Sequence, residues 1–408
     1  MILTVWLTNR GVWLCLRNLS DPLSFCSQNN AGEELILYLF ASGPAIWLIV
    51  LSQRRKIFVT SWKGNIVVLV FICLAVLSIL WSVQRISTFY HILILLFSTI
   101  LAASLGVYFS SDRWLTLLAG AGAIIVITRL ILWISFPQAI IMGPPHAGSW
   151  RGIYWHKNFT GSLMALWNAV FLLYGIRAFR ELRWQAGVSA LLYLLSLVFI
   201  FLSLSAAGIA IWLGLNLAII IFLIWSKIKN TLKKQHYIWL GYTAIVLIIL
   251  VATNLDFILG LFNRETNLTG RLPLWNYLIE KAVIQRPFLG HGFGAIWDIQ
   301  EFRRQATLSL GWSFVITNGH NGFMDILLGL GILGLALAVS LLTLALHRTG
   351  KYFVPDSTVA NMLPLVIVVY FLLSNLSISF FLGIESFHWV LLITALFIST
   401  SAANHITQ

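Results

Sequence analysis

The stretch TFYHILILLFSTILAASLGVYF, residues 88–109, contains no Asp, Glu, Lys or Arg. A helix needs about 20 consecutive apolar residues to cross the hydrocarbon core of a bilayer. The run is solidly apolar and does not alternate, which is typical of a transmembrane helix and not of a barrel strand. With it, ten segments predict spanning helices, at residues 35–52, 64–82, 88–109, 114–136, 158–176, 185–204, 207–225, 237–257, 358–380 and 383–402. An eleventh, 322–346, is equally apolar but has Asp325 near its start.

The composition of the whole chain agrees with this interpretation. Of its 408 residues, 59% are hydrophobic and 10% are charged, and the mean hydropathy is +0.90. A soluble protein carries about 25% charged residues and about 45–50% apolar ones. The composition therefore excludes an ordinary soluble enzyme, a disordered chain and a fibrous repeat. We expect an all-α polytopic membrane protein with about 11–12 transmembrane helices, forming a single integral membrane domain over residues 1–408.

The formal net charge of +13 reflects membrane topology more than a nucleic-acid partner, which we do not expect. Most basic residues lie in short runs between the apolar segments, and such runs favour the cytoplasmic side. The loops 137–157 and 258–320 then lie outside a bacterial cytoplasmic (inner) membrane. Residues 1–30 are compatible with a further span or with an interfacial helix. The basic runs are QRRK (53–56), SSDRW (110–114), RAFRELR (177–183), SKIKNTLKK (226–234) and HRTGK (347–351).

The loop 258–320 is the longest connection in the chain, and long loops of this kind are usually functional or disordered. It contains LWNYLIEKAVIQRPFL, with apolar residues at roughly helical spacing at Leu274, Leu278, Ala282 and Ile284. We expect a short amphipathic helix here, lying on the membrane surface, with Pro273 near its start.

Three motifs on the predicted outer side combine cations or imidazoles with glycine and tryptophan. They are SWRGIYWHKN (149–158), TGRLPLWNYLIEKAVIQRPFLGHGFG (269–294) and NGHNGFMDILLGLGILGL (318–335). In this order, the motifs resemble the O-antigen ligase and polysaccharide polymerase superfamily of bacteria, and most of all its exopolysaccharide polymerases of the ExoQ type. SILWSVQR (78–85) is similar to an early block of the same superfamily.

The resemblance implies a glycosyltransferase that uses an undecaprenyl-diphosphate-linked glycan as donor. It implies transfer to a sugar hydroxyl outside the cytoplasmic membrane, without a metal or a nucleotide sugar, and we expect no cofactor. Because the diphosphate would leave from the face opposite the attacking hydroxyl, we expect the anomeric configuration to invert. The partners would be the donor, an acceptor glycan, the bilayer and a chain-length regulator. The residue types agree, because the arginine fork suits phosphate and histidine titrates in the range that a general base needs. The cysteines, Cys15, Cys26 and Cys73, lack metal-ligand spacing.

Within the motifs, the resemblance assigns Arg151 and Arg271 to the donor diphosphate and His320 to the general base. Arg151 could instead be an interfacial arginine reaching lipid headgroups. Arg271 stands at a predicted helix start, where free N–H groups add to its charge. Supporting roles are open for five further residues, each with a structural alternative: Lys157, Asn321 as a helix cap, Asp325, Arg286 and His291.

Arg129 is the lone basic residue inside an apolar segment, where an arginine needs a partner or a wet cavity. The residue types alone favour a structural role for it.

Two other functions remain as alternatives. One is an O-antigen ligase that transfers the glycan to lipid A-core. The other, from a different class, is a transporter or flippase for lipid-linked glycans, which would place polar groups near the bilayer midplane and show internal repeats. Here the polar groups concentrate in the predicted outer loops, which favours the transferase.

Overall fold

The computed structural model describes residues 55–137, 141–143, 146–152, 154, 156–181, 183–228, 271–312, 315–353, 358–381 and 387–406. The predicted spans at 35–52 and 237–257, the segment 1–30 and residues 258–270 of the long loop lie outside the described residues.

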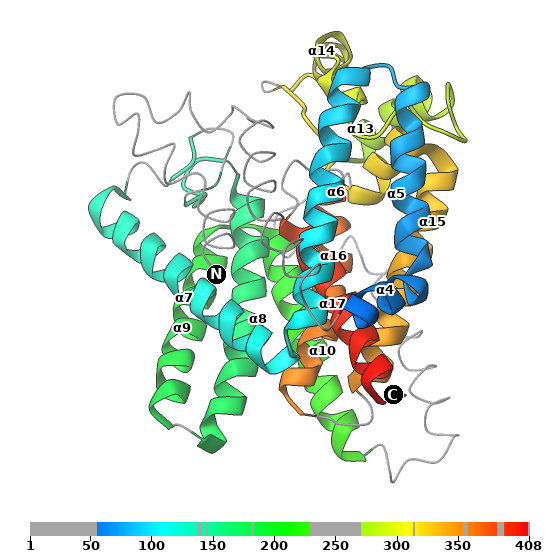
Figure 1. Cartoon of the computed structure of the whole chain (residues 1–408). Helices are drawn as coiled ribbons and strands as arrows, with labels where there is room; N and C mark the ends of the chain where they lie inside the picture. The colour runs from blue at the N-terminus through cyan, green and yellow to red at the C-terminus, as the bar shows by residue number, and fades with distance from the viewer. Residues whose placement is uncertain are drawn as a thin grey trace.

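Helices dominate the described part of the chain (Figure 1). Those before the long loop are α4 (Arg55–Gly64), α5 (Ile66–Leu77), α6 (Arg85–Tyr108), α7 (Ser111–Ser135), α8 (Lys157–Glu181), α9 (Arg183–Leu202) and α10 (Ala206–Ile228). Those after it are α13 (Arg271–Leu278), α14 (Gln300–Ser309), α15 (Gly322–Phe353), α16 (Leu363–Asn375) and α17 (Phe387–Ile406). A π-helical turn, Ile279–Val283, continues α13, and short 3₁₀ turns occupy Ser78–Leu80, Ile296–Asp298 and Ala360–Met362.

The all-α polytopic membrane class is confirmed. Six of the described helices, α6, α7, α8, α9, α10 and α15, are long and apolar enough to cross a membrane. A seventh span is possible if α4 and α5, which meet at an angle of 77°, are counted as one. The helices α16 and α17 are shorter but apolar. The total of 11–12 spans stays a prediction, because two expected spans lie outside the described residues.

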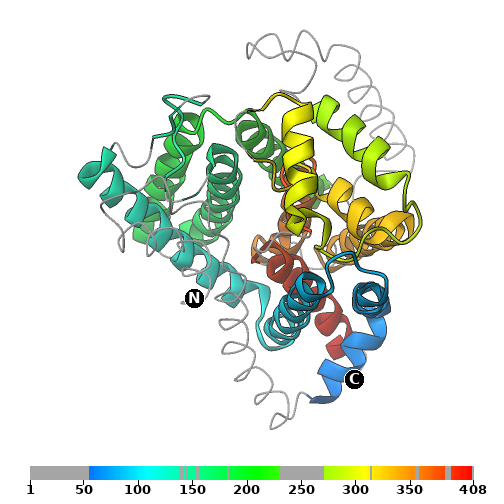
Figure 2. The ribbon, with the colours of Figure 1, turned by 90° about the horizontal axis from the view of Figure 1, so that it is seen from above.

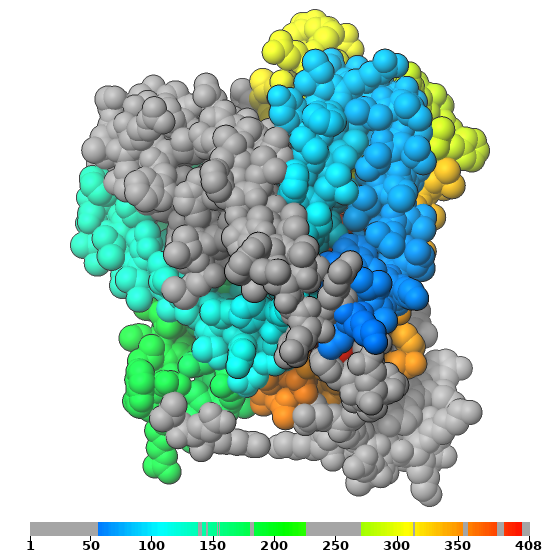
Figure 3. Space-filling view, in the orientation of Figure 1, coloured from blue at the N-terminus to red at the C-terminus, as the bar shows by residue number. Residues whose placement is uncertain are grey.

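The three motifs gather at one end of the helices, the upper end in Figure 1. This end, which we call the motif end, carries the described residues of the ranges 141–156 and 271–321. Seen from above, α7, α8 and α9 lie on one side, and α5, α6 and α15 lie on the other (Figure 2). On the face shown in Figure 3, α5 and α6 form one continuous wall with α14 above it.

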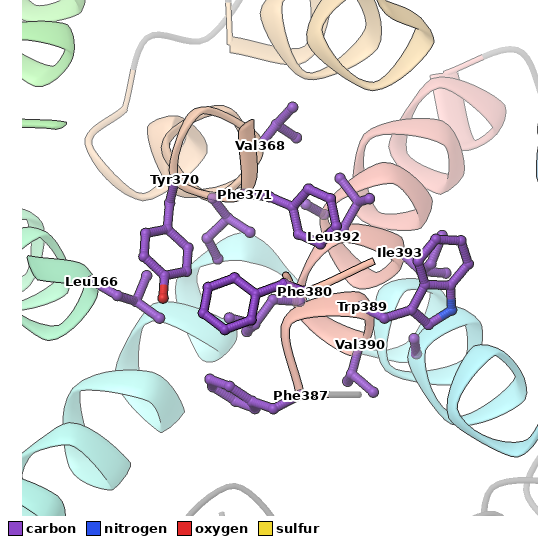
Figure 4. Packing of buried hydrophobic residues seen from close by; sticks show 14 of the residues in the cluster. Leu166, Val368, Tyr370, Phe371, Phe380, Phe387, Trp389, Val390, Leu392 and Ile393 are labelled. Atoms are coloured by element: carbon purple, nitrogen blue, oxygen red, sulfur yellow. The ribbon is translucent and has the colours of Figure 1, made fainter. Parts of the chain in front are cut away.

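The core is centred on α8, α16 and α17. Most side chains of these three helices are buried. Figure 4 shows Tyr370 and Phe371 of α16 close to Phe380 and Leu392, while Trp389 of α17 points toward the other side of the cluster. Trp389 Nε1 donates to Thr99 Oγ1 of α6 at 2.8 Å, a polar contact that joins α17 to α6. Helix α8 also packs against α7, α9 and α10. This packing fixes where α8 begins, and therefore where the SWRGIYWHKN loop lies.

Helix α15 is broken at Gly331, where φ is +66° and ψ is −164°. The sequence predicts one continuous span there, so the break is a correction. It removes two helical hydrogen bonds, those from Ile332 N–H to Leu328 C=O and from Leu333 N–H to Gly329 C=O. The loop around LGHGFG supplies new hydrogen-bond partners for these two N–H and two C=O groups. Without partners they would be costly, because an unpaired backbone group in an apolar environment is destabilising.

The replacement bonds form on both sides of the break. Leu328 C=O accepts from the N–H of His291, and Gly329 C=O accepts from the N–H of Gly292, each at 2.9 Å. Ile332 N–H donates to Pro287 C=O at 2.8 Å, and Leu333 N–H donates to Phe288 C=O at 3.4 Å. We call residues 286–293 together with 328–333 the glycine dock. Backbone groups of residues 287–292 thus form the hydrogen bonds that the break leaves open in α15.

A second apolar cluster lies at the motif end and corrects the prediction for LWNYLIEKAVIQRPFL. Leu274, Leu278 and Ala282 are buried, but against Trp297 and Leu328 of the protein, so this apolar face does not point outward as predicted. Ile284, predicted on the same face, is 65% exposed. The spacing changes because the chain passes into the π-helical turn, in which Ile284 N–H bonds to Ile279 C=O at 3.0 Å.

Candidate functional site

His320 lies in a tight loop between α14 and α15. Its φ of +49° is unusual for a residue with a side chain. Hydrogen bonds from neighbouring side chains to the loop backbone stabilise this conformation. Asn318 Oδ1 accepts the N–H of His320 at 2.9 Å. Asn321 Oδ1 accepts the N–H groups of Phe323 at 2.9 Å and Met324 at 3.2 Å, so the predicted helix cap of α15 is present.

Asp325 stabilises this loop by hydrogen bonds. Its Oδ1 accepts the N–H of Gly319 and the Nε1–H of Trp297, each at 2.9 Å. The side chain is 1% exposed. Trp275 Nε1 donates to Gly319 C=O at 2.8 Å from α13. Asp325 therefore fixes the backbone next to His320.

The imidazole of His320 is held by packing, because its ring nitrogens form no hydrogen bond within the described part of the chain. Its ring lies 6.3 Å from that of Trp312. A histidine that is positioned through its backbone but has both ring nitrogens available can accept a proton from a bound molecule.

Arg271 is the first residue of α13, as the sequence predicts. It is half-buried, and its positive charge acts on both His320 and His156. The start of the helix adds exposed N–H groups to this charge.

The SWRGIYWHKN loop brings a second set of basic groups to the same place. His156 Nδ1 accepts the N–H of Asn158 at 3.1 Å at the start of α8. The ring of His146 meets that of His156 edge to face, with the centroids 5.2 Å apart. Lys157 is buried and donates to Ser149 Oγ and to Leu204 C=O, both at 3.3 Å. This lysine ties the loop to the turn between α9 and α10.

These groups form what we call the cationic corner: His146, His156, Lys157, Arg271 and His320. Burial, and after it the nearby charges of Arg271 and His146, lower the pKa of His320 to about 4. The pKa of His156 is lowered to about 3, mainly by burial and then by His320. Both histidines are therefore neutral at neutral pH, the form in which an imidazole can accept a proton.

Arg151 lies in the same loop as His156 but is not among the charges that act on His320. It is buried, with an exposed fraction of 8%. Its carbonyl accepts the hydroxyl of Thr160 and, at 3.2 Å, the N–H of Tyr154, so the chain turns back at Arg151 above α8. The structure thus brings Arg271, His156 and His320 together, and it places Arg151 at the neighbouring turn.

Arg286 and His291 belong to the scaffold. Arg286 Nη1 donates to Trp81 C=O at 2.9 Å, and Trp81 Nε1 donates to Leu289 C=O at 3.0 Å. His291 is buried, and its Nε2–H donates to Ala282 C=O at 3.0 Å, while burial lowers its pKa. The SILWSVQR block therefore packs on the LGHGFG loop.

Sequence reasoning did not single out His146. The only signal was its place in the 137–157 loop, because its approach to His156 depends on how that loop folds back over α8. Within the described ranges, no three side chains of the His, Cys, Asp and Glu types are grouped so that they could hold a metal ion.

Comparisons with known proteins agree with these motifs. Residues 191–339 match the family model described as O-antigen ligase. This range includes Arg271, the glycine dock and His320, whereas Arg151 precedes it. The chain is also 33% identical over 113 residues to the exopolysaccharide production protein ExoQ of Rhizobium meliloti (strain 1021), which is 26% of this chain and 24% of that protein. The chain thus matches about a quarter of that relative's length. The resemblance to the O-antigen ligase and polysaccharide polymerase superfamily is confirmed.

Proposed function

We propose that the chain is a membrane glycosyltransferase that moves a saccharide from an undecaprenyl-diphosphate carrier to a hydroxyl of an acceptor glycan, as an exopolysaccharide or O-antigen polymerase. The observation that carries the proposal is the cationic corner: a neutral histidine with available ring nitrogens stands beside an arginine at a helix start. The corner brings together residues of all three motifs, which are far apart in the sequence.

In the proposed reaction, Arg271 binds the diphosphate, and Arg151 binds it from the neighbouring turn. The acceptor oxygen attacks the anomeric carbon as His320 takes its proton. The bond from the anomeric carbon to the phosphate oxygen breaks on the opposite face, so the configuration inverts and undecaprenyl diphosphate leaves. Because the bound diphosphate is anionic, it opposes the cations around His320 and raises the pKa of this base in the complex.

We place the site on the periplasmic side of a bacterial cytoplasmic membrane, from the positive-inside rule. Single cysteines at the exposed positions Ala147 and Ser309 test this in a chain whose native cysteines are replaced by serine. Both should react with a membrane-impermeant thiol reagent added from outside, whereas a cysteine at the exposed Lys351 should be protected. The reverse pattern would put the site on the wrong side for this function.

The functional test is purified protein in liposomes with lipid-linked repeat units. A polymerase makes longer glycans from these units alone. A ligase, the second candidate because the matched family carries that description, forms product only when lipid A-core is added. A transporter moves the units across the bilayer without making a glycosidic bond, and that result would overturn the proposal. A chain-length regulator, the protein partner that a polymerase implies, would narrow the product length when it is added.

A further inference from the structure

Arg129 is a buried arginine that the proposed mechanism does not use. It lies in α7, six residues before the end of that helix at Ser135, or about 9 Å from the end at 1.5 Å per residue. Its exposed fraction is 3%. This end of α7 is the motif end, so the guanidinium lies below the SWRGIYWHKN loop.

The loop is in direct contact with this guanidinium. The Cζ of Arg129 lies 4.3 Å from the ring centroid of Tyr154. A Cβ atom on Gly152 would stand 3.1 Å from Nη1 of Arg129, and the φ of Gly152 is +59°. A glycine at this turn therefore lets the backbone next to Arg151 lie close over the buried charge.

Two donor atoms of Arg129 have no acceptor. Its Nε and Nη2 form no hydrogen bond, and no carboxylate pairs with it in the described ranges. Two other arginines of the spanning helices differ in this respect. Arg177 pairs with Asp112 at 3.0 Å, and Arg348 donates to Asn65 Oδ1 at 2.7 Å and to the hydroxyl of Thr400 at 2.9 Å.

An arginine stays charged in a protein, and a buried charge is stable only when it is paired and hydrogen-bonded. The face of Tyr154 attracts the cation but accepts none of its N–H groups. The two open donors need acceptor oxygens, and an anion supplies these oxygens together with the opposite charge that Arg129 lacks. Phosphate fits best, because its oxygens match the guanidinium fork.

We propose that Arg129 is a third phosphate-binding residue, which acts with Arg151 across the turn at Gly152. This inference rests on the proposed function. The two phosphates of a lipid-linked diphosphate lie at different depths, and Arg129 lies deeper in the bilayer than the loop above it. Arg129 therefore binds the phosphate on the lipid side. The loop and Arg271 are left for the phosphate that carries the sugar.

The test measures binding without turnover. Detergent-purified wild type, Arg129→Met and Arg129→Lys are titrated with undecaprenyl diphosphate, undecaprenyl monophosphate and phosphatidylglycerol, and the melting temperature of each ligand-free protein is recorded. Arg113→Gln is the matched control, because Arg113 is an exposed arginine in the first turn of the same helix.

We expect Arg129→Met to bind undecaprenyl diphosphate at least tenfold more weakly and to melt at or above the wild-type temperature when ligand-free, because an unpaired buried charge has been removed. Arg129→Lys should fall between the two, and Arg113→Gln should match wild type. A lower melting temperature of Arg129→Met with unchanged affinity would show a packing role and overturn the inference.

The three lipids separate the remaining outcomes. If Arg129→Met weakens binding of all three lipids equally, Arg129 is a general headgroup site and the assignment to the donor is wrong. If wild type itself does not bind undecaprenyl diphosphate, the proposed function fails. If wild type binds it and both Arg129 variants bind it equally well, this inference fails alone.

Discussion

The glycine dock and the cationic corner lie at the same end of the molecule and are built in opposite ways. In the dock, main-chain groups from two segments satisfy each other, and His291 and Arg286 donate to carbonyls within the scaffold. In the corner, positive and imidazole groups lie close enough to lower the pKa of His320 and His156. The comparison teaches that the dock is held mainly by backbone hydrogen bonds, while the corner is a cluster of basic side chains suited to chemistry.

The largest expected effect is in the corner. His320→Ala should lower turnover by about 10²–10⁴-fold, the usual cost of removing a positioned base, while donor binding stays near wild type. Glycan elongation and donor binding are measured on the same preparations. His291→Ala, in the dock, is the contrasting variant. It should lower the melting temperature and leave the turnover per folded molecule near wild type. Near-normal elongation by His320→Ala would remove the base from the mechanism.

Arg271→Ala should weaken donor binding by about 10- to 150-fold, which corresponds to losing a charge-assisted contact of about 1.5–3 kcal/mol. Arg271→Lys should restore only part of this, because lysine lacks the planar fork. Arg286→Ala is the matched control, since that arginine contacts Trp81 C=O in the dock. If Arg271→Ala and Arg286→Ala bind the donor with equal affinity, donor binding does not distinguish the corner from the dock.

Gly331→Ala tests the dock by stability. Its backbone conformation is one that only glycine adopts readily, and the cost for another residue is about 1–3 kcal/mol. An added Cβ would also stand 2.3 Å from the carbonyl carbon of Phe288. We expect a lower free energy of unfolding, measured by denaturation in detergent. Gly350→Ala in the same helix has open space around its Cβ position and should be neutral or slightly stabilising.

The smallest effect concerns pH. Protonated His320 cannot act as a base, so kcat/KM should fall as the pH drops through about 4, and not through the usual value near 6.5. His146 is one of the charges that lower the pKa of His320. His146→Gln removes that charge, so the pKa should rise and the acid limb should move to higher pH. His347→Gln, at an exposed position near the other end of α15, should leave the limb in place.

The sequence predicts the spans better than it predicts the site. Solidly apolar runs such as residues 88–109 and 158–176 correspond to α6 and α8, because such a run has few other stable conformations. The break in α15 was not predictable, because LGLGILGL is as apolar as an unbroken span. Its cause is a partner loop some forty residues earlier in the chain, a spacing that hydropathy does not record.

In the site, features that depend on neighbouring residues in the sequence were predictable, and features that depend on tertiary packing were not. The Asn321 cap and the helix start at Arg271 follow from neighbouring residues, and both are present. The approach of His146 and His156 to His320 depends on how α7, α8 and α15 pack. The position of Arg129 under Gly152 depends on the same packing. No spacing along the chain contains that information.

The exchange of hydrogen bonds around Gly331 also bears on biosynthesis. A chain emerges from the ribosome N-terminus first, so residues 287–292 are made before helix α15. A helix that lacks two of its internal hydrogen bonds inserts poorly by itself, because each unpaired group costs several kcal/mol in lipid. When α15 is synthesised, the loop that completes it already exists. Moving the LGHGFG segment downstream of α15 by circular permutation should therefore impair insertion, even though the final contacts would be the same.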